Sequence, residues 1–381
     1  MAERKEGRRT REEGRGKREE GRGCVVEGEH LGVLLSSHRR TTMQLLGCLF
    51  LFLFFRCFSS DVEIERGSID IVGTTTRIKQ CRHGYFIYHT TDVPIGRALD
   101  LYGEWSEFPL SLLLDFISQG DVVLDIGGNI GTFAIPFANA VGLSGEVHTF
   151  EPQPHVHHLL MTNKHLNTLP QLFAHNVAIG NTSGIVNVPD DLDYENPGSN
   201  HGGFSLASFE NYEGRATTKI HKINQWSLDS LEFIKCPSVI KIDTEGYEAY
   251  VLQGGEKFLT TVCSPIIYIE NNCEKHSSAI INRLDAYGYQ CLWDVTSHYN
   301  ANNYAGNSFN AVSDLWVEIN MLCIPKTSKQ IQAVVEYVRR GFTRVDPRYP
   351  LLSMYYVIRR GTSDEEQAPN SYFAQMSSEH C

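Results

Sequence analysis

Short apolar runs that alternate with helical patterns predict an α/β protein. From Asp61 onward this alternation continues for most of the chain, and it is typical of a parallel sheet covered by helices. Residues 122–124 are continuously apolar, as a strand buried on both faces must be. A glycine-rich turn follows them and leads into a helix. We therefore predict a doubly wound, Rossmann-like, mostly parallel sheet of about seven strands with helices on both faces.

The predicted strands are short runs rich in β-branched and aromatic residues. They span residues 85–89, 122–126, 146–150, 172–179, 239–242, 266–270, 289–293 and 315–323. The predicted helices repeat apolar residues at a spacing of three or four. They span residues 109–118, 132–141, 153–167, 247–254 and 277–287. In sheets of this kind ligands bind at the carboxyl ends of the strands, which is where chemistry is expected.

The composition is that of a folded protein with an acidic body. The 381 residues are 41% hydrophobic and 21% charged, which excludes a disordered or collagen-like chain. The net charge is −11, but residues 1–42 carry +3, so the remainder carries −14. Because sequence-independent binding to nucleic acid depends on neutralising phosphates, we expect no nucleic-acid partner.

The cysteine pattern gives no clear framework. Seven cysteines follow residue 60, an odd number, and several stand within apolar runs. No Cys-x-x-Cys pair occurs, which argues against a zinc ribbon or a thioredoxin-type site. We therefore expect buried thiols rather than a disulfide framework.

The first 60 residues differ from the rest. Residues 1–42 begin with a run of Arg, Lys, Glu and Gly that cannot form a core, so they are predicted to be a disordered charged leader. The apolar run 45–55 follows two arginines and is too short to span a ~30 Å membrane. Segment 43–60 is predicted to be a signal peptide, with a short hydrophobic membrane anchor as the alternative. Because Met43 would give an ordinary secretory start, residues 1–42 are interpreted as an upstream extension outside the natural chain.

The turn after the first buried strand predicts a nucleoside site. Gly127 and Gly131 let the backbone turn and approach a ligand ahead of a helix N-terminus. The dinucleotide pattern Gly-x-Gly-x-x-Gly needs glycine at 129, where this chain has asparagine. Asp125 ends the strand, and its carboxylate repels a pyrophosphate but attracts a cation. Asp125, Gly127, Asn129 and Gly131 are therefore predicted to bind S-adenosylmethionine, whose amino and sulfonium groups are positive, rather than NAD.

Two further strand ends fit the same ligand. Glu151 follows the second strand, where a carboxylate can accept hydrogen bonds from both ribose hydroxyls. Asn176 lies toward the end of the third predicted strand, where its amide could reach the adenine amino group. Both are predicted cofactor-binding residues.

Taken together, these motifs resemble the FkbM family of S-adenosylmethionine-dependent methyltransferases. The likeness runs from about Arg82 to Pro325 and leaves the leader and the tail outside it. It implies the methyltransferase fold and reaction, and it leaves the acceptor open. The motifs are DVPIG at 92–96, LYGEWSE at 101–107, GDVVLDIGGNIG at 120–131, FEP at 150–152, IKIDTEGYE at 240–248, VLQGG at 251–255, residues 300–307, and NMLCIP at 320–325.

The IKIDTEGYE motif supplies the predicted catalytic groups. If the strand continues through it, Lys241, Asp243 and Glu245 point to one side. Neighbouring carboxylates raise one another's pKa, which suits a base that works near neutrality. The resemblance places Asp243 and Glu245 near the methyl group, so Asp243 is the first choice for a base or an acceptor-orienting residue. The alternatives are that Asp243 caps the following helix and that Lys241 forms a structural ion pair.

Two other residues are candidates near this site. His201 lies in a polar insertion and is an alternative base, although a loop histidine is more often simply solvated. Glu270 ends another strand, where it could orient acceptor hydroxyls or share a metal ion with Asp243. No third ligand is evident, so no metal site is predicted.

We interpret the chain as one decorated catalytic domain. Residues 61–117 are an N-terminal cap segment, 118–345 an FkbM-like methyltransferase domain and 346–381 a C-terminal tail. The predicted reaction is in-line transfer of a methyl group from S-adenosylmethionine to a hydroxyl of a sugar or natural product. The alternatives are a dinucleotide-dependent oxidoreductase and a non-catalytic binding protein. A small-molecule or glycan acceptor is the expected partner, and the sequence leaves the oligomeric state open. The run 45–55 suggests the secretory pathway or membrane association, with the cytoplasm as the alternative.

Overall fold

The computed structural model describes most of the chain after residue 66. The described residues are 67–189, 194, 196, 198, 200–209, 220–232, 234–272, 276–310, 317–329 and 343–344. The predictions for the leader 1–42, for segment 43–60 with its apolar run, and for the tail 346–381 lie outside these residues. No helix within the described ranges is both long enough and apolar enough to cross a membrane.

The described chain opens with a small antiparallel sheet, which the sequence predicted only in part. Its strands are β1 (Ser68–Asp70), β2 (Thr76–Cys81) and β3 (Gly84–His89), and the helices α2 (Ile95–Tyr102) and α3 (Glu107–Leu114) follow. Asn163 joins this region to the next, because its side chain accepts from Ile87 N at 2.6 Å and donates to Ile130 O at 2.9 Å. Both side-chain groups of this buried asparagine are therefore satisfied by backbone from two different segments.

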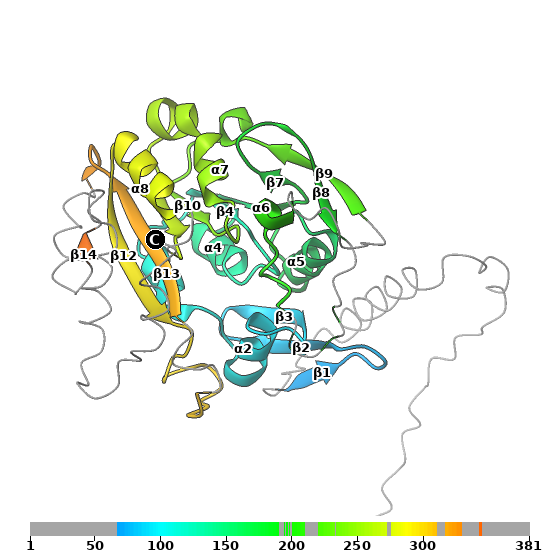
Figure 1. Ribbon diagram of the computed structural model, residues 1–381. Helices are drawn as coiled ribbons and strands as arrows, with labels where there is room; N and C mark the ends of the chain where they lie inside the picture. Colours follow the sequence, from blue (N-terminus) through cyan, green and yellow to red (C-terminus); the bar gives the residue numbers. More distant parts are fainter. Residues whose placement is uncertain are drawn as a thin grey trace, which may run out of the picture. The chain divides into compact units, whose positions relative to one another are not determined.

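The main sheet confirms the predicted fold class. Its order is β14-β12-β13-β11-β10-β4-β5-β6. The strands β4, β5, β6, β10 and β11 are parallel to one another, in the arrangement of a doubly wound sheet. β13 is antiparallel to both of its neighbours, so β12 runs in the same direction as β11 (Figure 1). The strands are β4 (Val122–Ile126), β5 (Glu146–Phe150), β6 (Leu172–His175), β10 (Val239–Ile242), β11 (Ile266–Glu270), β12 (Tyr289–Ser297), β13 (Val317–Pro325) and the two-residue β14 (Thr343–Arg344).

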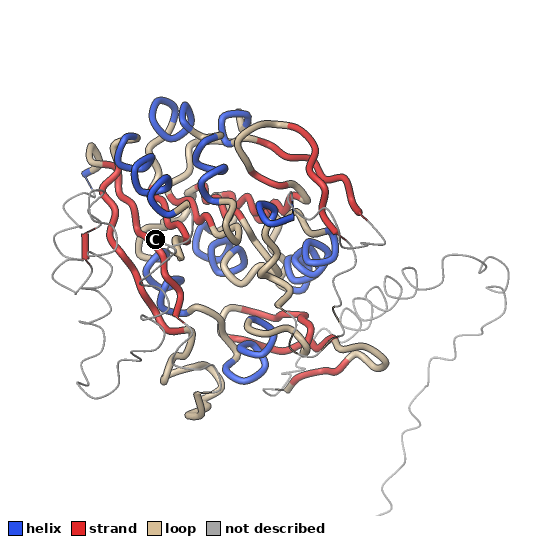
Figure 2. Tube along the Cα trace, viewed as in Figure 1, coloured by secondary structure: helices blue, strands red, loops and turns tan. Residues whose placement is uncertain are grey.

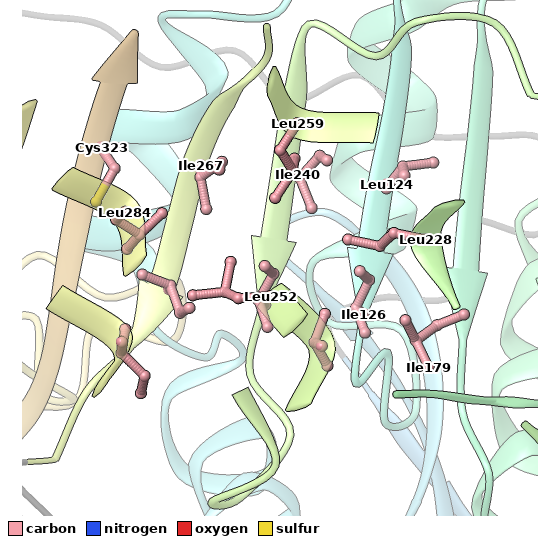
Figure 3. Close-up of a cluster of buried hydrophobic side chains, with 14 of the residues drawn as sticks. Leu124, Ile126, Ile179, Leu228, Ile240, Leu252, Leu259, Ile267, Leu284 and Cys323 are labelled. Atoms are coloured by element: carbon pink, nitrogen blue, oxygen red, sulfur yellow. The ribbon is translucent and has the colours of Figure 1, made fainter. Parts of the chain in front are cut away.

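Helices pack on both faces of this sheet (Figure 2). Successive strand residues alternate between two clusters, so that Leu124 packs on one face and Val123 on the other. Figure 3 shows the first face, where Leu284 of a helix lies beside Ile267 and Cys323 of the sheet. The first face is covered by η1 (Leu228–Ser230), α7 (Glu248–Gln253), η2 (Phe258–Val262) and α8 (Ser277–Ala286), and the second by α2, α3, α4 (Ala134–Val141) and α5 (Pro154–Leu166).

One predicted strand is in fact two. The run 172–179 forms β6 in the main sheet and β7 (Ala178–Ile179) in a separate three-stranded sheet of order β7-β9-β8. The break falls at Asn176 and Val177, where the chain leaves one sheet for the other. The other strands of the small sheet are β8 (Gly184–Pro189) and β9 (Ile220–Trp226), and the short helix α6 (Leu206–Phe209) lies between them in sequence.

The expectation of buried thiols is wrong for four cysteines. Cys236 is bonded to Cys263, and Cys291 is bonded to Cys323. Cys291 and Cys323 are directly opposite each other on β12 and β13. Only the strand pairing brings them together, so neither their spacing nor their number could show it. Cys81 is the one free, buried cysteine among the described residues.

The core makes a direct prediction about stability. Leu124 is fully buried on β4, whereas Leu143 is 82% exposed. We expect Leu124→Ala to lower the free energy of unfolding by about 2–5 kcal/mol, because it leaves a cavity. Leu143→Ala should change it by no more than about 0.5 kcal/mol. Urea unfolding followed by circular dichroism measures both, and equal effects of the two substitutions would contradict this core.

Candidate functional site

A cavity of about 580 Å³ lies where the carboxyl ends of β4, β5, β10, β11 and β12 meet. The position is the one expected for a doubly wound sheet. One part of the wall comes from the turns after β4 and β5, and another from β11, β13 and the segment after β12. The N-terminal region contributes Pro94, Ile95 and Trp105. Of the predicted site residues, the wall includes Asp125, Gly127, Asn129, Glu151, Lys241, Asp243 and Glu245.

Asp125 is held by the two strands beside it. The register places it opposite Lys241 on β10 and opposite Thr149 on β5. Thr149 Oγ1 donates to Asp125 Oδ2 at 3.2 Å, and Lys241 Nζ lies 3.7 Å from Oδ1. Burial raises the pKa of Asp125 to about 6, against the opposing effect of Lys241. Oδ1 accepts no hydrogen bond within the described chain, so this buried oxygen remains available to a donor in the cavity.

The turn after β4 depends on two residues in the left-handed region. Gly127 has φ +83°, and a Cβ there would overlap the carbonyl oxygen of Asp243. Asn129 has φ +47°, a conformation that asparagine tolerates better than most residues. Its backbone N–H donates to Glu151 Oε2 at 3.0 Å. The missing dinucleotide glycine is thus replaced by an asparagine that ties the turn to the end of β5.

Glu151 is a buried carboxylate fixed by backbone donors. Gln153 N donates to Oε1 at 2.9 Å, and Asn129 N donates to Oε2. Burial nevertheless raises the pKa of Glu151 to about 7. Each carboxylate oxygen has a second lone pair, so Glu151 can still accept hydrogen bonds from two hydroxyls of a ligand.

Lys241 joins the two halves of the site. It is buried at the end of β10, where its Nζ lies 3.0 Å from Asp243 Oδ2 and 4.8 Å from the centre of the Phe133 ring. Burial disfavours its charge, but the attraction of Asp243 and Asp125 outweighs this, and the pKa of Lys241 is raised. Lys241 is therefore a fixed ammonium group between two carboxylates.

β10 ends at Ile242, so the strand does not continue through Asp243 and Glu245 as the alternation of side chains required. Glu245 has φ +54°, and α7 begins only at Glu248. Asp243 is not the cap of that helix, because its N-cap residue is Tyr247. The Glu248 carboxylate organises the turn instead, accepting from Thr244 N at 2.8 Å and Gly246 N at 3.1 Å. Asp243 and Glu245 consequently both face the cavity.

Three predicted site residues lie outside the cavity wall. Asn176 is at the break between β6 and β7, where its Nδ2 donates to Glu151 O and Pro152 O, so its amide supports the backbone after β5. Gly131 packs against the side chain of Ile135, 3.6 Å from where its own Cβ would be. His201 is buried and is not part of the wall, although its neighbours Asn200 and Gly202 are; its Nδ1 lies 3.8 Å from Asp92 Oδ1 and its ring edge packs against His89.

The sequence analysis missed most of the opposite wall. His298 directly follows β12, and Glu318 lies on β13 beside it, with His298 Nδ1 3.0 Å from Glu318 Oε1. Asn320 is paired with Glu270 between β13 and β11. Burial and the nearby charges of Asp243, Glu245 and Glu248 raise the pKa of Glu270 well above its usual range. Glu318 and Asn320 reach this edge because β13 runs antiparallel to its neighbours. No local sequence motif predicts this direction.

The two walls suit different chemistry. The buried carboxylates Asp125 and Glu151 suit a ligand with positive charge and hydroxyl groups. The opposite wall offers the carboxyl group of Glu270, the amide of Asn320 and the imidazole of His298, which can bind and orient a polar acceptor. Within the described part of the chain, no group of three or more His, Cys, Asp or Glu side chains is placed to hold a metal ion.

The family model described as the methyltransferase FkbM domain matches residues 125–291. Over these residues the chain is similar to FkbM methyltransferase domains. The match begins at Asp125 and includes Glu151, Asp243 and Glu270, so most of the cavity wall lies within the matched residues. His298 and Glu318 lie beyond its end.

A curated relative of the FkbM domain is the hexuronic acid methyltransferase AglP of Haloferax volcanii. It is 30% identical over 176 residues, which are 46% of this chain and 66% of the relative. The match therefore spans just under two thirds of that protein's length.

Solved methyltransferase structures are also similar, at low scores. TYW2 of M. jannaschii, in complex with AdoMet, is 14% identical, covers 67% of this chain and 88% of its own, and has a TM-score of 0.36. A precorrin-6y C5,15-methyltransferase of Geobacter metallireducens GS-15 is 11% identical, covers 57% and 86%, and has a TM-score of 0.35. Scores this low carry no weight for the site.

The close approach of the two turns predicts a large effect of one methyl group. Gly127→Ala would place a methyl group against the carbonyl oxygen of Asp243 at a left-handed φ. We expect this substitution to lower the free energy of unfolding by about 2–4 kcal/mol. Gly184→Ala is the matched control, because a Cβ there meets nothing within 4 Å. Thermal melts of both variants measure the effect. Equal melting temperatures for Gly127→Ala and the control would contradict the close approach of Gly127 to the Asp243 carbonyl oxygen.

Proposed function

We propose that this protein is an S-adenosylmethionine-dependent methyltransferase that methylates a hydroxyl group of a sugar or natural product. The observation that carries the proposal is the pair of buried carboxylates, Asp125 and Glu151, at neighbouring strand ends of one cavity. Burial raises the pKa of both carboxyl groups. Their ionised forms are therefore stabilised by a bound ligand that brings a cation or several hydroxyl donors. The FkbM match supports the same reading.

The residues present fit S-adenosylmethionine. Asp125 Oδ1, a buried oxygen without a hydrogen-bond donor in the described chain, suits an ammonium group. Glu151 suits the two ribose hydroxyls, while Val177 and Ile179 provide apolar wall for a flat base. When bound, this molecule supplies an electrophilic methyl group on a positively charged sulfur. Asp125, Glu151 and the turn at Asn129 would hold it in one orientation.

The opposite wall supports a hydroxyl-bearing acceptor. Asp243, Glu245, Glu270 and Asn320 present several hydrogen-bonding groups and, with Trp105, an aromatic surface. Such a combination recognises polyhydroxylated molecules through planar polar groups and ring contacts. The relative AglP is named for a hexuronic acid substrate, which supports a sugar as the acceptor class here. Asp243, held by Lys241, would orient the acceptor.

We also propose that the protein works in an oxidising compartment of the secretory pathway. The run 45–55 has the length and the basic flank of a signal peptide. The bonded pairs Cys236–Cys263 and Cys291–Cys323 support this, because disulfides persist in such compartments and are rare in the cytosol. Sequencing the N-terminus of the secreted protein tests the proposal, and a cytosolic protein with reduced cysteines would refute it.

Ligand titration separates the methyltransferase from its two rivals. Calorimetric titration of the purified protein with S-adenosylmethionine and with NAD⁺ should give binding of the former only. Binding of NAD⁺ alone would favour an oxidoreductase. Binding of neither would favour a non-catalytic protein on the same fold.

Two carboxamide variants test the division of roles within the site. Asp125→Asn removes a buried charge from the proposed cofactor site, so we expect S-adenosylmethionine to bind at least about thirtyfold more weakly. Asp243→Asn should keep this affinity within about threefold and lower kcat, because Asp243 faces the acceptor wall. Calorimetry and release of S-adenosylhomocysteine measure the two effects. An equal loss of affinity in both variants would contradict the division.

Cofactor affinity should depend on pH. The pKa values of about 6 for Asp125 and about 7 for Glu151 mean that both are largely protonated at pH 5.5 in the free protein. Because a cation and ribose hydroxyls prefer the ionised forms, affinity should rise with pH and level off above about pH 7.5. We expect the dissociation constant of S-adenosylmethionine to fall at least about tenfold between pH 5.5 and 8. A flat profile would show that neither carboxylate titrates on binding.

A further inference from the structure

The end of β12 carries a histidine that no motif pointed to. His298 follows Ser297, the last residue of β12, and β12 runs in the same direction as β11. His298 therefore lies at the same edge of the sheet as Asp125 and Glu270, and it lines the same cavity. It belongs to the wall that faces the acceptor in the proposed function, on which the following inference rests.

The His298 ring has two neighbours that orient it, Glu318 and Trp105. Its Nδ1 is buried and lies 3.0 Å from Glu318 Oε1, at ion-pair distance, although it makes no hydrogen bond within the described chain. The ring stacks on the Trp105 indole, with the centroids 4.3 Å apart and the planes at 19°. Ser106 Oγ donates to the same Glu318 oxygen, which fixes that carboxylate in turn. Nε2 makes no hydrogen bond within the described chain, so the cavity side of the imidazole remains available.

Three other ionisable groups of the cavity, Asp243, Lys241 and Glu270, are less suited to take a proton. Asp243 Oδ2 already accepts from Lys241 Nζ at 3.0 Å. Lys241 is a fixed ammonium group, and burial with the neighbouring charge of Asp243 raises the pKa of Glu270. Histidine gains and loses a proton near neutrality, and a carboxylate beside one ring nitrogen leaves the other nitrogen basic.

We propose that His298 is the general base that takes the proton from the acceptor hydroxyl, with Glu318 as its positioning residue. The acceptor O–H bond breaks as the proton moves to His298 Nε2, and the oxygen electron pair forms the new O–CH₃ bond. The CH₃–S bond breaks with its electron pair remaining on sulfur, which becomes neutral. The positive charge passes to the imidazole, where the Glu318 carboxylate stabilises it until the proton leaves to water.

The first test needs no acceptor. Nitrogen NMR of histidine-labelled full-length protein with bound S-adenosylmethionine reports which ring nitrogen of His298 carries the proton, and His298→Gln assigns the signal. We expect the neutral ring to be protonated at Nδ1, toward Glu318, with Nε2 unprotonated. Glu318→Ala should give a mixture of the two forms, and Glu318→Gln should largely restore the first, since its amide oxygen can still accept. A wild-type ring protonated at Nε2 could not accept a proton from the cavity and would overturn the proposal.

The second test is kinetic, with methyl glucoside, methyl galactoside and methyl glucuronide as acceptor probes. For any probe that is methylated, His298→Ala should lower kcat by about 100-fold or more and keep S-adenosylmethionine affinity within about threefold. Added imidazole should restore part of the rate, which it would not do for a purely structural residue. His165→Ala, at an exposed position of α5, is the control and should leave kcat unchanged.

The outcomes separate this inference from the proposed function. Loss of less than threefold in kcat for His298→Ala, on an enzyme that binds and uses S-adenosylmethionine, overturns only the role of His298. Failure of the wild-type protein to bind S-adenosylmethionine overturns the proposed function itself. If no probe is methylated, the NMR result for Nδ1 and Nε2 decides alone.

Discussion

The buried ammonium group of Lys241 is the constraint around which the site is built. It lies between Asp125 on β4 and Asp243 after β10, and it packs over the Phe133 ring. A buried charge that loses a partner is destabilised, so the three charged groups of Lys241, Asp125 and Asp243 depend on one another. Because Lys241 and Asp125 are neighbours across two strands, a one-residue slip would turn one of them to the opposite face. The ion pair and the strand register therefore stabilise each other.

Around this centre, backbone groups do most of the positioning. The Glu248 carboxylate accepts hydrogen bonds from backbone N–H groups of the turn after β10. Because Gly127 has no Cβ, the carbonyl of Asp243 can approach the turn after β4. The two turns that carry the carboxylates are thus in direct contact. Charged side chains that would repel one another in water are kept near each other by a scaffold that cannot relax locally.

Residues whose position follows from local pattern were predictable. The bounds of β4, β5, β10 and β11 agree with the apolar runs, because a strand buried on both faces has a distinct composition. Asp125 and Glu151 could be found because they end such strands, and ends of parallel strands meet. Asn176 failed as a guide because the chain changes sheets there, which the continuous apolar run 172–179 conceals.

Residues brought together by strand pairing were not predictable. Cys291 and Cys323, and likewise His298 and Glu318, meet because β13 returns antiparallel between β11 and β12. At least 19 residues lie between the members of each pair in sequence, and nothing in either segment encodes its neighbour. The turn at Glu245 was also hidden, since a left-handed glutamate is not expected from its residue type.

Because β13 runs against β12, the chain leaves the sheet at Ser297 and re-enters it at Val317 on the edge that holds the cavity. Insertions and deletions in this connection can therefore reshape one wall of the cavity without disturbing the pairing of any strand. The carboxylates at the ends of β4 and β5 stand on other strands, outside this connection. Over evolutionary time, descendants of this scaffold can exchange one acceptor for another by loop length alone while the donor end of the site stays constant.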